Sequence, residues 1–366
     1  MLGSYLIKEL ILIKTKEREF MKNIITKSAF LFVGAILSAN SLFAKDDVEV
    51  ITVHHFMSSK APLQTKLLEP WAKKIEEASG GKLKIEIFPS MSMGGKPDEL
   101  YKQVRNGTAD IVWTLPGYTP GVFPRTEVFE LPTVHIGDAV ATSIAMREKF
   151  DLIKDDFTDV KPLLVYAAAG NALHTVNKKI TNMSDLKGLK LRAPSRTAGW
   201  YIEAMGAESV GMPLPDLPQA LSKNAIDGAL VPFEVFPAYK FAQLTQYSIE
   251  GEKGERFGTS VFMLLMNNDR FNSLSKELQK VLLDSVDMNT VKEVGQLWMD
   301  FEKPGMQMQK DSKGGEIIKL DSNAMAEFNK AGEQVVQRWV EEAKTKGIDG
   351  QKLVDSAREA ISASSK

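Results

Sequence analysis

Residues 185–194, Asp-Leu-Lys-Gly-Leu-Lys-Leu-Arg-Ala-Pro, form the most informative stretch of this chain. Leu189 and Leu191 predict a short strand that carries Arg192 to its carboxyl end, where Pro194 stops it. A planar guanidinium at such a place can bind a carboxylate through two parallel hydrogen bonds. A surface ion pair is the alternative for an isolated arginine, but the pattern around this one favours an anion site.

The N-terminal segment has the pattern of an export signal that starts at a second methionine, Met21. Lys22 opens a positively charged region, and residues 29–37 form an apolar run. Because this run is about ten residues, it is too short for the roughly 20 that span a bilayer. We therefore predict an upstream extension over 1–20, a signal peptide over 21–44 and a periplasmic mature chain. An uncleaved membrane anchor is the alternative.

Composition excludes several classes of function. The chain has no cysteine, which excludes thiol catalysis and cysteine metal sites and is compatible with export. Its formal net charge is −1, so no basic field indicates nucleic acid as a partner. A mature chain of about 320 residues is long enough for about two domains.

Short strands and amphipathic helices alternate in two similar segments, 48–114 and 189–230. Near the end of each segment a helix stops, an aspartate follows (Asp110 or Asp227), and the chain enters a strand. This β-α-β-α-β order predicts two α/β lobes, each with a parallel sheet covered by helices.

A long helix and a helical tail are predicted after these segments. The apolar periodicity of residues 275–298 predicts one helix of about 24 residues, which would be about 36 Å long and could brace both lobes. Residues 324–362 have the pattern of two or three amphipathic helices.

Motifs for catalysis are missing from the sequence. The four histidines are His54, His55, His135 and His174, and none forms a helical i, i+4 pair with a carboxylate. The chain has no G-x-S-x-G elbow, no P-loop and no glycine-rich dinucleotide fingerprint. We therefore predict no catalytic residue, no metal site and no cofactor.

Aromatic residues gather where predicted strands end. Phe56 follows the first strand, Trp113 and Tyr118 lie at and after the Asp110 strand, and Phe233 follows the strand that starts near Ile226. Ligands of open parallel sheets bind at the carboxyl ends of the strands. These rings could therefore line an apolar pocket around Arg192. For each ring, plain hydrophobic core is the alternative.

With these residues in view, the chain resembles the solute-binding proteins of tripartite ATP-independent periplasmic (TRAP) transporters, the DctP type. The resemblance covers essentially all of the mature chain, and residues 185–194 are its strongest part. Supporting segments are Asn106–Asp110, Glu130–Pro132, Gly206-Ala207, Met212-Pro213 and Gln219–Leu221.

The resemblance implies an α/β fold: a two-lobed periplasmic binding protein, type II-like, with a long helix bracing both lobes. Lobe I would comprise 46–169 with 259–298, and lobe II 170–258 with 299–366. It also implies that the lobes close around a small organic acid, that Arg192 pairs with the ligand carboxylate, and that the acid is delivered to TRAP permease membrane subunits.

The chain departs from the family pattern at two positions. Many relatives carry a second arginine shortly after the glycine equivalent to Gly170, where this chain has Asn171. Binders of sugar acids often have an asparagine where this chain has Val231. Both changes favour a compact or aromatic monocarboxylate over a sialic-acid-like or heavily hydroxylated ligand.

The predicted site combines one cation, three polar side chains that could bind the ligand's remaining polar atoms, and four rings that could enclose its body. These ligand-binding residues are Arg192; His54, Asn171 and His174; and Phe56, Trp113, Tyr118 and Phe233. We expect a monomer with no nucleic-acid partner.

Two other functions stay open from the sequence. An exported two-lobed α/β enzyme acting on an organic acid would need a proton-transfer group opposite Arg192, and His54 and Glu234 are the candidates. A ligand-presenting partner of a sensor kinase or chemoreceptor would share the same pocket and differ in its docking surface.

Overall fold

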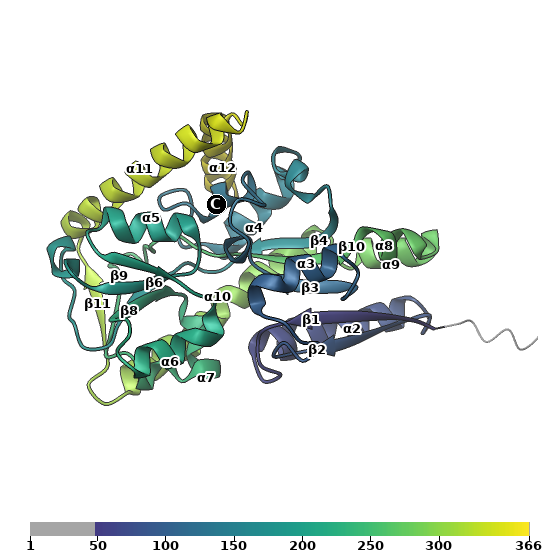
Figure 1. Ribbon diagram of the computed structural model, residues 1–366, viewed down its shortest axis with the longest axis horizontal. Helices are drawn as coiled ribbons and strands as arrows, with labels where there is room; N and C mark the ends of the chain where they lie inside the picture. The colour runs from purple at the N-terminus through teal and green to yellow at the C-terminus, as the bar shows by residue number, and fades with distance from the viewer. Residues whose placement is uncertain (1–47, 366) are drawn as a thin grey trace, which may run out of the picture. The chain divides into compact units, whose positions relative to one another are not determined.

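The computed structural model describes residues 48–365; the predicted upstream extension (1–20) and signal peptide (21–44) lie outside the described residues. From Val50 onward the chain forms one compact unit that contains two β-sheets with helices packed against them (Figure 1). We call the five-stranded sheet with its helices lobe I, and the six-stranded sheet with its helices lobe II. None of the described helices combines the length and apolar character needed to cross a bilayer.

Lobe I is built on a sheet with strand order β2-β1-β3-β10-β4. Its strands are β1 (Glu49–His55), β2 (Leu83–Phe88), β3 (Ile111–Thr114), β4 (Val160–Ala167) and β10 (Val261–Asn267). β1 runs parallel to β3, whereas β10 runs antiparallel to both β3 and β4. The sheet is therefore mixed, which corrects the prediction of a parallel sheet. All seven residues of β10 are buried, because the strand lies in the sheet interior with both faces covered.

Lobe II is built on a sheet with strand order β11-β9-β5-β8-β6-β7. Its strands are β5 (Ala172–Thr175), β6 (Lys190–Ala193), β7 (Glu208–Gly211), β8 (Gly228–Val231), β9 (Tyr247–Gly251) and β11 (Glu316–Leu320). β6 is parallel to β7 and β8, and β5 is antiparallel to β8 and β9. In the second predicted α/β segment (189–230), the first strand, β6, therefore lies beside the third strand, β8.

Helices follow the strands as the alternating pattern predicts. The helices between β1 and α10 are α2 (Glu69–Ala78), α3 (Leu100–Arg105), α4 (Ala139–Glu148), α5 (Arg196–Ala204), α6 (Leu217–Ser222), α7 (Phe236–Tyr239), α8 (Asn268–Ser273) and α9 (Lys276–Asp284). A π-helical segment, η1 (Leu63–Leu68), precedes α2 and continues directly into it.

The helix that braces both lobes is α10 (Met288–Asp311), which is 24 residues long. It packs against α4 in lobe I and against β11 and the 3-10 segment η9 (Phe233–Val235) in lobe II. The prediction of one helix over 275–298 is wrong, because Asp287 begins a new helix by accepting a hydrogen bond from the Thr290 N–H (2.8 Å). The brace therefore starts later and reaches further along the chain than predicted.

The C-terminal tail forms two helices, α11 (Ser322–Thr345) and α12 (Gly350–Ser364), as the amphipathic pattern predicts. In Figure 1 α11 lies along α5 of lobe II and α12 beside α4 of lobe I, and α11–α5 and α12–α4 are the corresponding contacts. The tail thus connects the two lobes a second time. The exact lobe boundaries given above stay a prediction.

Candidate ligand-binding site

A cavity lies between the lobes, at the carboxyl ends of parallel strands of both sheets. Its empty volume, which includes space open to solvent, is about 360 Å³. Lobe I lines it with residues at or after the ends of β1 and β3 and with the start of β10: Phe56, Met57, Trp113, Leu115, Tyr118 and Phe262. Lobe II lines it with residues at or after β6, β7 and β8: Arg192, Pro194, Leu214, Val231, Glu234 and Val235.

Aromatic rings of lobe I form one wall of this cavity. The Phe56 ring centroid lies 5.1 Å from that of Trp113 and 5.3 Å from that of Tyr118. Trp113 stacks on Phe262 at 4.8 Å. The Trp113 indole N–H donates a hydrogen bond to the Tyr166 hydroxyl (2.8 Å), which fixes the plane of the indole. The wall is therefore both apolar and rigid.

Arg192 supplies the positive charge of the cavity. Its side chain donates from Nε to the Met212 carbonyl (2.9 Å) and from Nη1 to the Leu230 carbonyl (3.1 Å), and the residue is 2 % exposed. Both acceptors are neutral, and none of the ion pairs among residues 48–365 includes Arg192. Burial lowers the pKa of this guanidinium, yet an arginine stays charged in a protein. A buried cation without a carboxylate partner is costly unless an anion joins it.

The fold holds Arg192 in place from both sides. β6 lies between β7 and β8, and Arg192 is paired in register with Val210 and Ala229. Two residues after the strand, the Ser195 hydroxyl caps α5 by accepting a hydrogen bond from the Ala198 N–H (3.3 Å). The strand end that carries the guanidinium is therefore fixed by the sheet and by the next helix.

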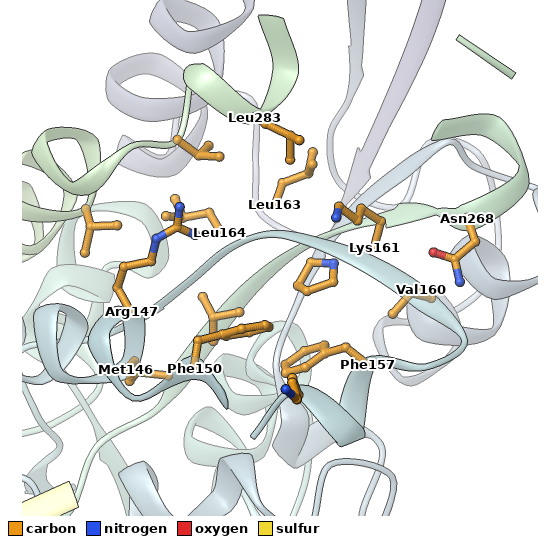
Figure 2. Close-up of a pocket in the computed structure, with 15 residues that line it drawn as sticks. Met146, Arg147, Phe150, Phe157, Val160, Lys161, Leu163, Leu164, Asn268 and Leu283 are labelled. Atoms are coloured by element: carbon orange, nitrogen blue, oxygen red, sulfur yellow. The ribbon is translucent and has the colours of Figure 1, made fainter. Parts of the chain in front are cut away.

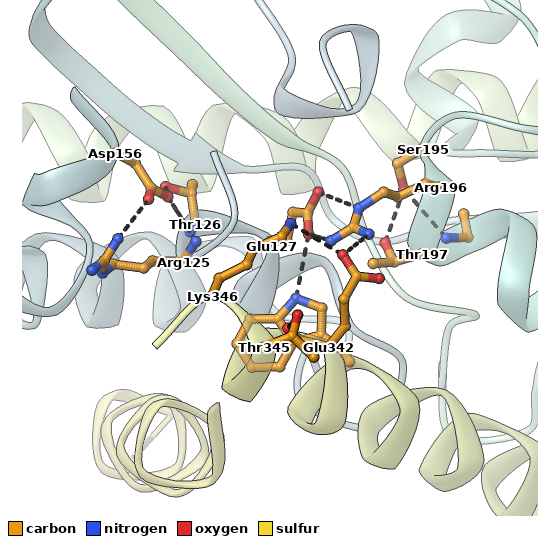
Figure 3. A network of polar contacts seen from close by, with 12 residues as sticks. Arg125, Thr126, Glu127, Asp156, Ser195, Arg196, Thr197, Glu342, Thr345 and Lys346 are labelled. Atoms are coloured by element: carbon orange, nitrogen blue, oxygen red, sulfur yellow. Dashed lines mark hydrogen bonds and ion pairs between the residues drawn. The ribbon is translucent and has the colours of Figure 1, made fainter. Parts of the chain in front are cut away.

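A charged network attaches the segment after Arg192 to the rest of the molecule (Figure 3). Arg196 binds both oxygens of Glu127, at 2.7 Å from Nε and 2.5 Å from Nη2, and Glu342 of α11 at 2.5 Å from Nη1. Glu127 lies in the 3-10 segment η4 (Thr126–Glu130) and also accepts from the Trp339 indole (3.3 Å). This network positions the site without contributing to its lining.

Tyr118 connects the two walls of the cavity. Its hydroxyl accepts a hydrogen bond from the Leu214 N–H of lobe II (2.9 Å). Burial raises the pKa of Tyr118, and the nearby Arg192 guanidinium opposes that shift, so the phenol stays neutral beside the cation. Next to it, Gly117 packs so tightly on lobe II that an added Cβ would lie 2.6 Å from the Pro194 carbonyl oxygen. The lobes are thus in close contact around the cavity.

Glu234 is the acidic side chain of the cavity wall. Its backbone N–H donates to Glu302 Oε1 of α10 (2.9 Å). Burial raises the pKa of the Glu234 carboxyl well above its usual range, and the neighbouring Glu302 carboxyl raises it further. This shift favours the protonated carboxyl, which presents both a donor and an acceptor.

Two of the predicted polar partners lie away from the cavity wall. The His54 ring binds Gln103 Oε1 through Nδ1 (2.7 Å) and accepts from the Met93 N–H at Nε2 (3.3 Å). The His174 ring contacts the Ser248 hydroxyl (2.8 Å) and the Val231 carbonyl (3.1 Å). Both nitrogens of each ring are thus occupied by protein groups, and neither histidine is among the residues that line the cavity.

Asn171 and Phe233 are also buried outside the cavity lining. Asn171 exchanges backbone hydrogen bonds with Gly258 and Phe257, and within the described chain its side-chain amide has no partner. The Phe233 ring packs at 4.9 Å on His174 and lies beneath the Arg256 guanidinium at 5.4 Å. The structure therefore brings together Arg192, Phe56, Trp113 and Tyr118 from the predicted set.

The bacterial extracellular solute-binding protein family 7 (DctP) is the family whose model matches this chain, over residues 53–343. The match includes every residue that lines the cavity. The chain belongs to this family. DctP-family solute-binding proteins of TRAP transporters are periplasmic ligand-binding transport proteins, so the resemblance found in the sequence and the two-lobed fold are both confirmed.

Two solved DctP-family structures are especially similar. A TRAP solute-binding protein from a marine metagenome, described as specific for aromatic acid ligands and crystallised with 3-hydroxybenzoate, is 40% identical, with a TM-score of 0.85 over 87% of this chain and 100% of that chain. One from Rhodoferax ferrireducens T118, with copurified benzoate, is 36% identical, with a TM-score of 0.83 over 86% of this chain and 98% of that chain. A more distant relative, the sialic acid-binding periplasmic protein SiaP of Vibrio cholerae, is 25% identical over 57% of this chain and 67% of its own length.

Sequence reasoning missed part of the cavity wall of this DctP-family member. Phe262 lies in β10 and Ser260 directly precedes it; this strand enters the sheet antiparallel and therefore brings its first residues to the edge where the parallel strands end. Leu115 and Leu214 carry no distinguishing signal. Glu234 was considered as a proton-transfer group of an enzyme, although its place three residues after β8 could have indicated the cavity.

A second, wider pocket lies along the edge strand β4 of lobe I (Figure 2). Arg147 and Lys161 flank an apolar floor that includes Phe150, Phe157 and Leu163. Arg147 is exposed, so its charge stays in contact with water and would hold an anion weakly. None of the predicted ligand-binding residues lines this pocket, and among residues 48–365 no cluster of His, Asp and Glu side chains could hold a metal ion.

Proposed function

We propose that this DctP-family protein captures an aromatic monocarboxylate between its lobes and delivers it to a TRAP permease. In this proposal the chain is exported by the signal peptide predicted over 21–44 and acts as a monomer. Arg192 binds the carboxylate, and Phe56, Trp113 and Tyr118 enclose the ring. His54, Asn171, His174 and Phe233 stay predictions from the sequence and are left out of this proposed set.

The buried guanidinium of Arg192 is the observation that carries the proposal. Its protein partners are neutral groups, the Met212 and Leu230 carbonyls and the adjacent Tyr118 phenol, which leave its buried positive charge uncompensated. A ligand carboxylate would supply the missing negative charge through a charge-assisted hydrogen bond, which is stronger than one between neutral groups. Because the cavity lining contains a single cation, it matches a monocarboxylate better than a dicarboxylate.

The shape of the cavity supports an aromatic ligand body. The wall of Phe56, Trp113 and Phe262 offers faces and edges on which a flat ring can pack, each pair adding about 0.5–1.5 kcal/mol beyond the buried area. Carbohydrate hydroxyls would face this wall without partners, at about 1–3 kcal/mol each. The two similar proteins crystallised with benzoate and 3-hydroxybenzoate fit the same chemistry.

A ligand screen tests the proposal. The mature protein is unfolded thermally with benzoate, 3-hydroxybenzoate, succinate, glucuronate or N-acetylneuraminate, and ligands that raise the Tm are titrated by calorimetry. An aromatic monocarboxylate at 100 times its Kd should stabilise the protein by about 2.7 kcal/mol, while the sugar acids leave the Tm unchanged. Stabilisation by the sugar acids alone would contradict the proposal.

The same proposal assigns a binding role rather than catalysis. His54, one candidate for proton transfer, has both ring nitrogens bound to protein groups and lies outside the cavity lining. Prolonged incubation with a bound aromatic acid should return the ligand with its mass unaltered. A new product in the mass spectrum, dependent on the protein, would instead support the exported enzyme.

A further inference from the structure

A carboxyl-bearing residue, Glu234, lines the ligand cavity in addition to Arg192. Among the residues that line the cavity, Arg192 and Glu234 are the ones with a guanidinium and a carboxyl group. Glu234 is mostly surrounded by protein, but it is partly accessible and is one of the residues that line the cavity. A polar side chain in this position costs free energy unless it finds a hydrogen-bond partner.

The neighbouring charged groups do not use the Glu234 carboxyl. Glu302 accepts the Glu234 backbone N–H (2.9 Å) with one oxygen and binds Arg256 with the other (3.2 Å). Arg256 also forms an ion pair with Glu250, which in turn binds Lys319. The nearby cations are thus paired with other carboxylates, and no ion pair among the described residues includes Glu234.

In its protonated form the Glu234 carboxyl has one donor and one acceptor to offer. Burial and the adjacent Glu302 carboxyl raise the pKa of Glu234 and so favour this form, whereas the Trp298 indole acts in the opposite direction. A hydroxyl group complements such a carboxyl in both roles, since it can donate to the C=O and accept from the O–H.

The sheet places Glu234 within reach of a ligand held by Arg192. β6 and β8 are neighbouring parallel strands, with Arg192 in register with Ala229, and the chain passes from β8 directly to Glu234. An aromatic ring anchored by its carboxylate at Arg192 can therefore present a substituent to Glu234.

We propose that Glu234 is a specificity-determining residue that recognises a hydroxyl group on the ligand, so that hydroxylated aromatic acids bind more tightly than benzoate. This inference rests on the proposed function, because Arg192 must first hold the carboxylate. A site with a buried polar group discriminates strongly against a ligand that leaves this group without a hydrogen-bond partner. An apolar site discriminates less strongly against a ligand with an extra hydroxyl.

Calorimetry with benzoate, 3-hydroxybenzoate and 4-hydroxybenzoate tests the inference on the wild-type protein. At least one hydroxybenzoate should bind about tenfold or more tightly than benzoate, since an unpaired buried acceptor or donor costs about 1–3 kcal/mol. If benzoate binds as tightly as both hydroxybenzoates, the inference is overturned while the proposed function stands. If none of the three binds, the proposed function fails first.

Two variants then assign the preference to Glu234. Glu234→Met keeps the size but removes both polar atoms, and it should bind benzoate and the preferred hydroxybenzoate equally. Glu234→Gln keeps a donor and an acceptor, and it should retain a preference for the hydroxybenzoate. Glu293→Met, at an exposed position of α10, is the matched control and should leave the affinity ratio unchanged.

The ratio of the affinities for the preferred hydroxybenzoate and for benzoate also distinguishes recognition of the hydroxyl by Glu234 from a purely structural role of this residue. A structural role alone would weaken both ligands in parallel in Glu234→Met, and a parallel loss would overturn the inference. Should Glu234→Met not fold, a crystal structure of the wild-type complex decides: the ligand hydroxyl within about 3 Å of a Glu234 oxygen supports the inference, and a hydroxyl directed elsewhere overturns it.

Discussion

Replacement of Arg192 should abolish most ligand affinity while the protein stays folded. Arg192→Met removes the charge but keeps an unbranched apolar side chain in the cavity wall. In the complex, the ligand carboxylate would then be buried without a cation. Removing one partner of a buried ion pair costs about 3–5 kcal/mol, which corresponds to a loss of about 150-fold to several thousand-fold in affinity.

The ligand-free protein should respond far less to the same change. Its Arg192 charge is buried against two carbonyl oxygens, so the variant loses two hydrogen bonds of about 0.5–1.5 kcal/mol each. At the same time, the cost of burying an unpaired charge disappears. The free energy of unfolding should therefore change by less than about 2 kcal/mol.

Calorimetry and urea unfolding on the same samples measure both effects. Arg192→Lys should give an intermediate loss, because an ammonium keeps the charge but cannot form two parallel hydrogen bonds. Arg105→Met, at an exposed position of α3, is the control and should bind the acid like the wild-type protein. A folded Arg192→Met variant with wild-type affinity would refute the carboxylate-binding role of Arg192.

Three further outcomes are expected from the structure. Gly117→Ala places a Cβ 2.6 Å from the Pro194 carbonyl oxygen, so closure of the lobes around a ligand should cost about 1–3 kcal/mol more than in the wild type. Calorimetry should show weaker ligand binding, and unchanged affinity would contradict this prediction. Burial raises the pKa of Glu130 to about 8, so the folded state holds a proton that the unfolded state releases above its ordinary pKa near 4.5. The stability of the wild-type protein therefore falls as the pH rises toward 8, and the Tm advantage of Glu130→Gln over the wild type should grow from pH 5 to pH 8. A Tm difference that stays constant over this range would contradict the prediction. Burial lowers the pKa of His135 to about 4 and that of His174 to about 3, so these histidines take up protons in the unfolded chain before they do so in the folded protein. Stability is therefore lost as the pH falls below about 6.5. In urea unfolding, the free energy of unfolding of His135→Gln should fall less steeply with decreasing pH than that of the wild type, and equal pH dependence would exclude His135 as a cause of the loss.

The sequence predicted the parts of the site that follow local rules. Arg192, Trp113 and Tyr118 lie at or just after the ends of parallel strands, and the alternation of strands and helices is enough to place such residues at one edge of a sheet. Phe56 follows the same rule after β1. These positions depend on neighbours that are close along the chain.

Other parts depend on contacts between distant segments. His54 and His174 are polar residues near strand ends, but each ring is bound by groups of its own lobe, Gln103 and Ser248, which periodicity does not reveal. Phe262 reaches the cavity only because β10 inserts antiparallel between β3 and β4, and β10 starts at Val261, far along the chain from the end of β4 at Ala167. No local pattern encodes that pairing.

The break in the predicted long helix has a local cause that apolar periodicity hides. Apolar positions continue on one face through Val286, Val291 and Val294, which is why one helix was predicted. Ser285 and Asp287 end one helix and begin the next through side-chain hydrogen bonds, Ser285 to the Leu282 carbonyl and Asp287 from the Thr290 N–H. A capping aspartate within an apolar stripe is therefore the signal that was missed.

A crystal structure of the mature protein with bound 3-hydroxybenzoate tests the central claim most directly. We expect the carboxylate oxygens within about 3 Å of the Arg192 guanidinium nitrogens and the ring packed against Trp113 and Phe56. A complex in which the acid occupies another place, with no contact to Arg192, would contradict the account.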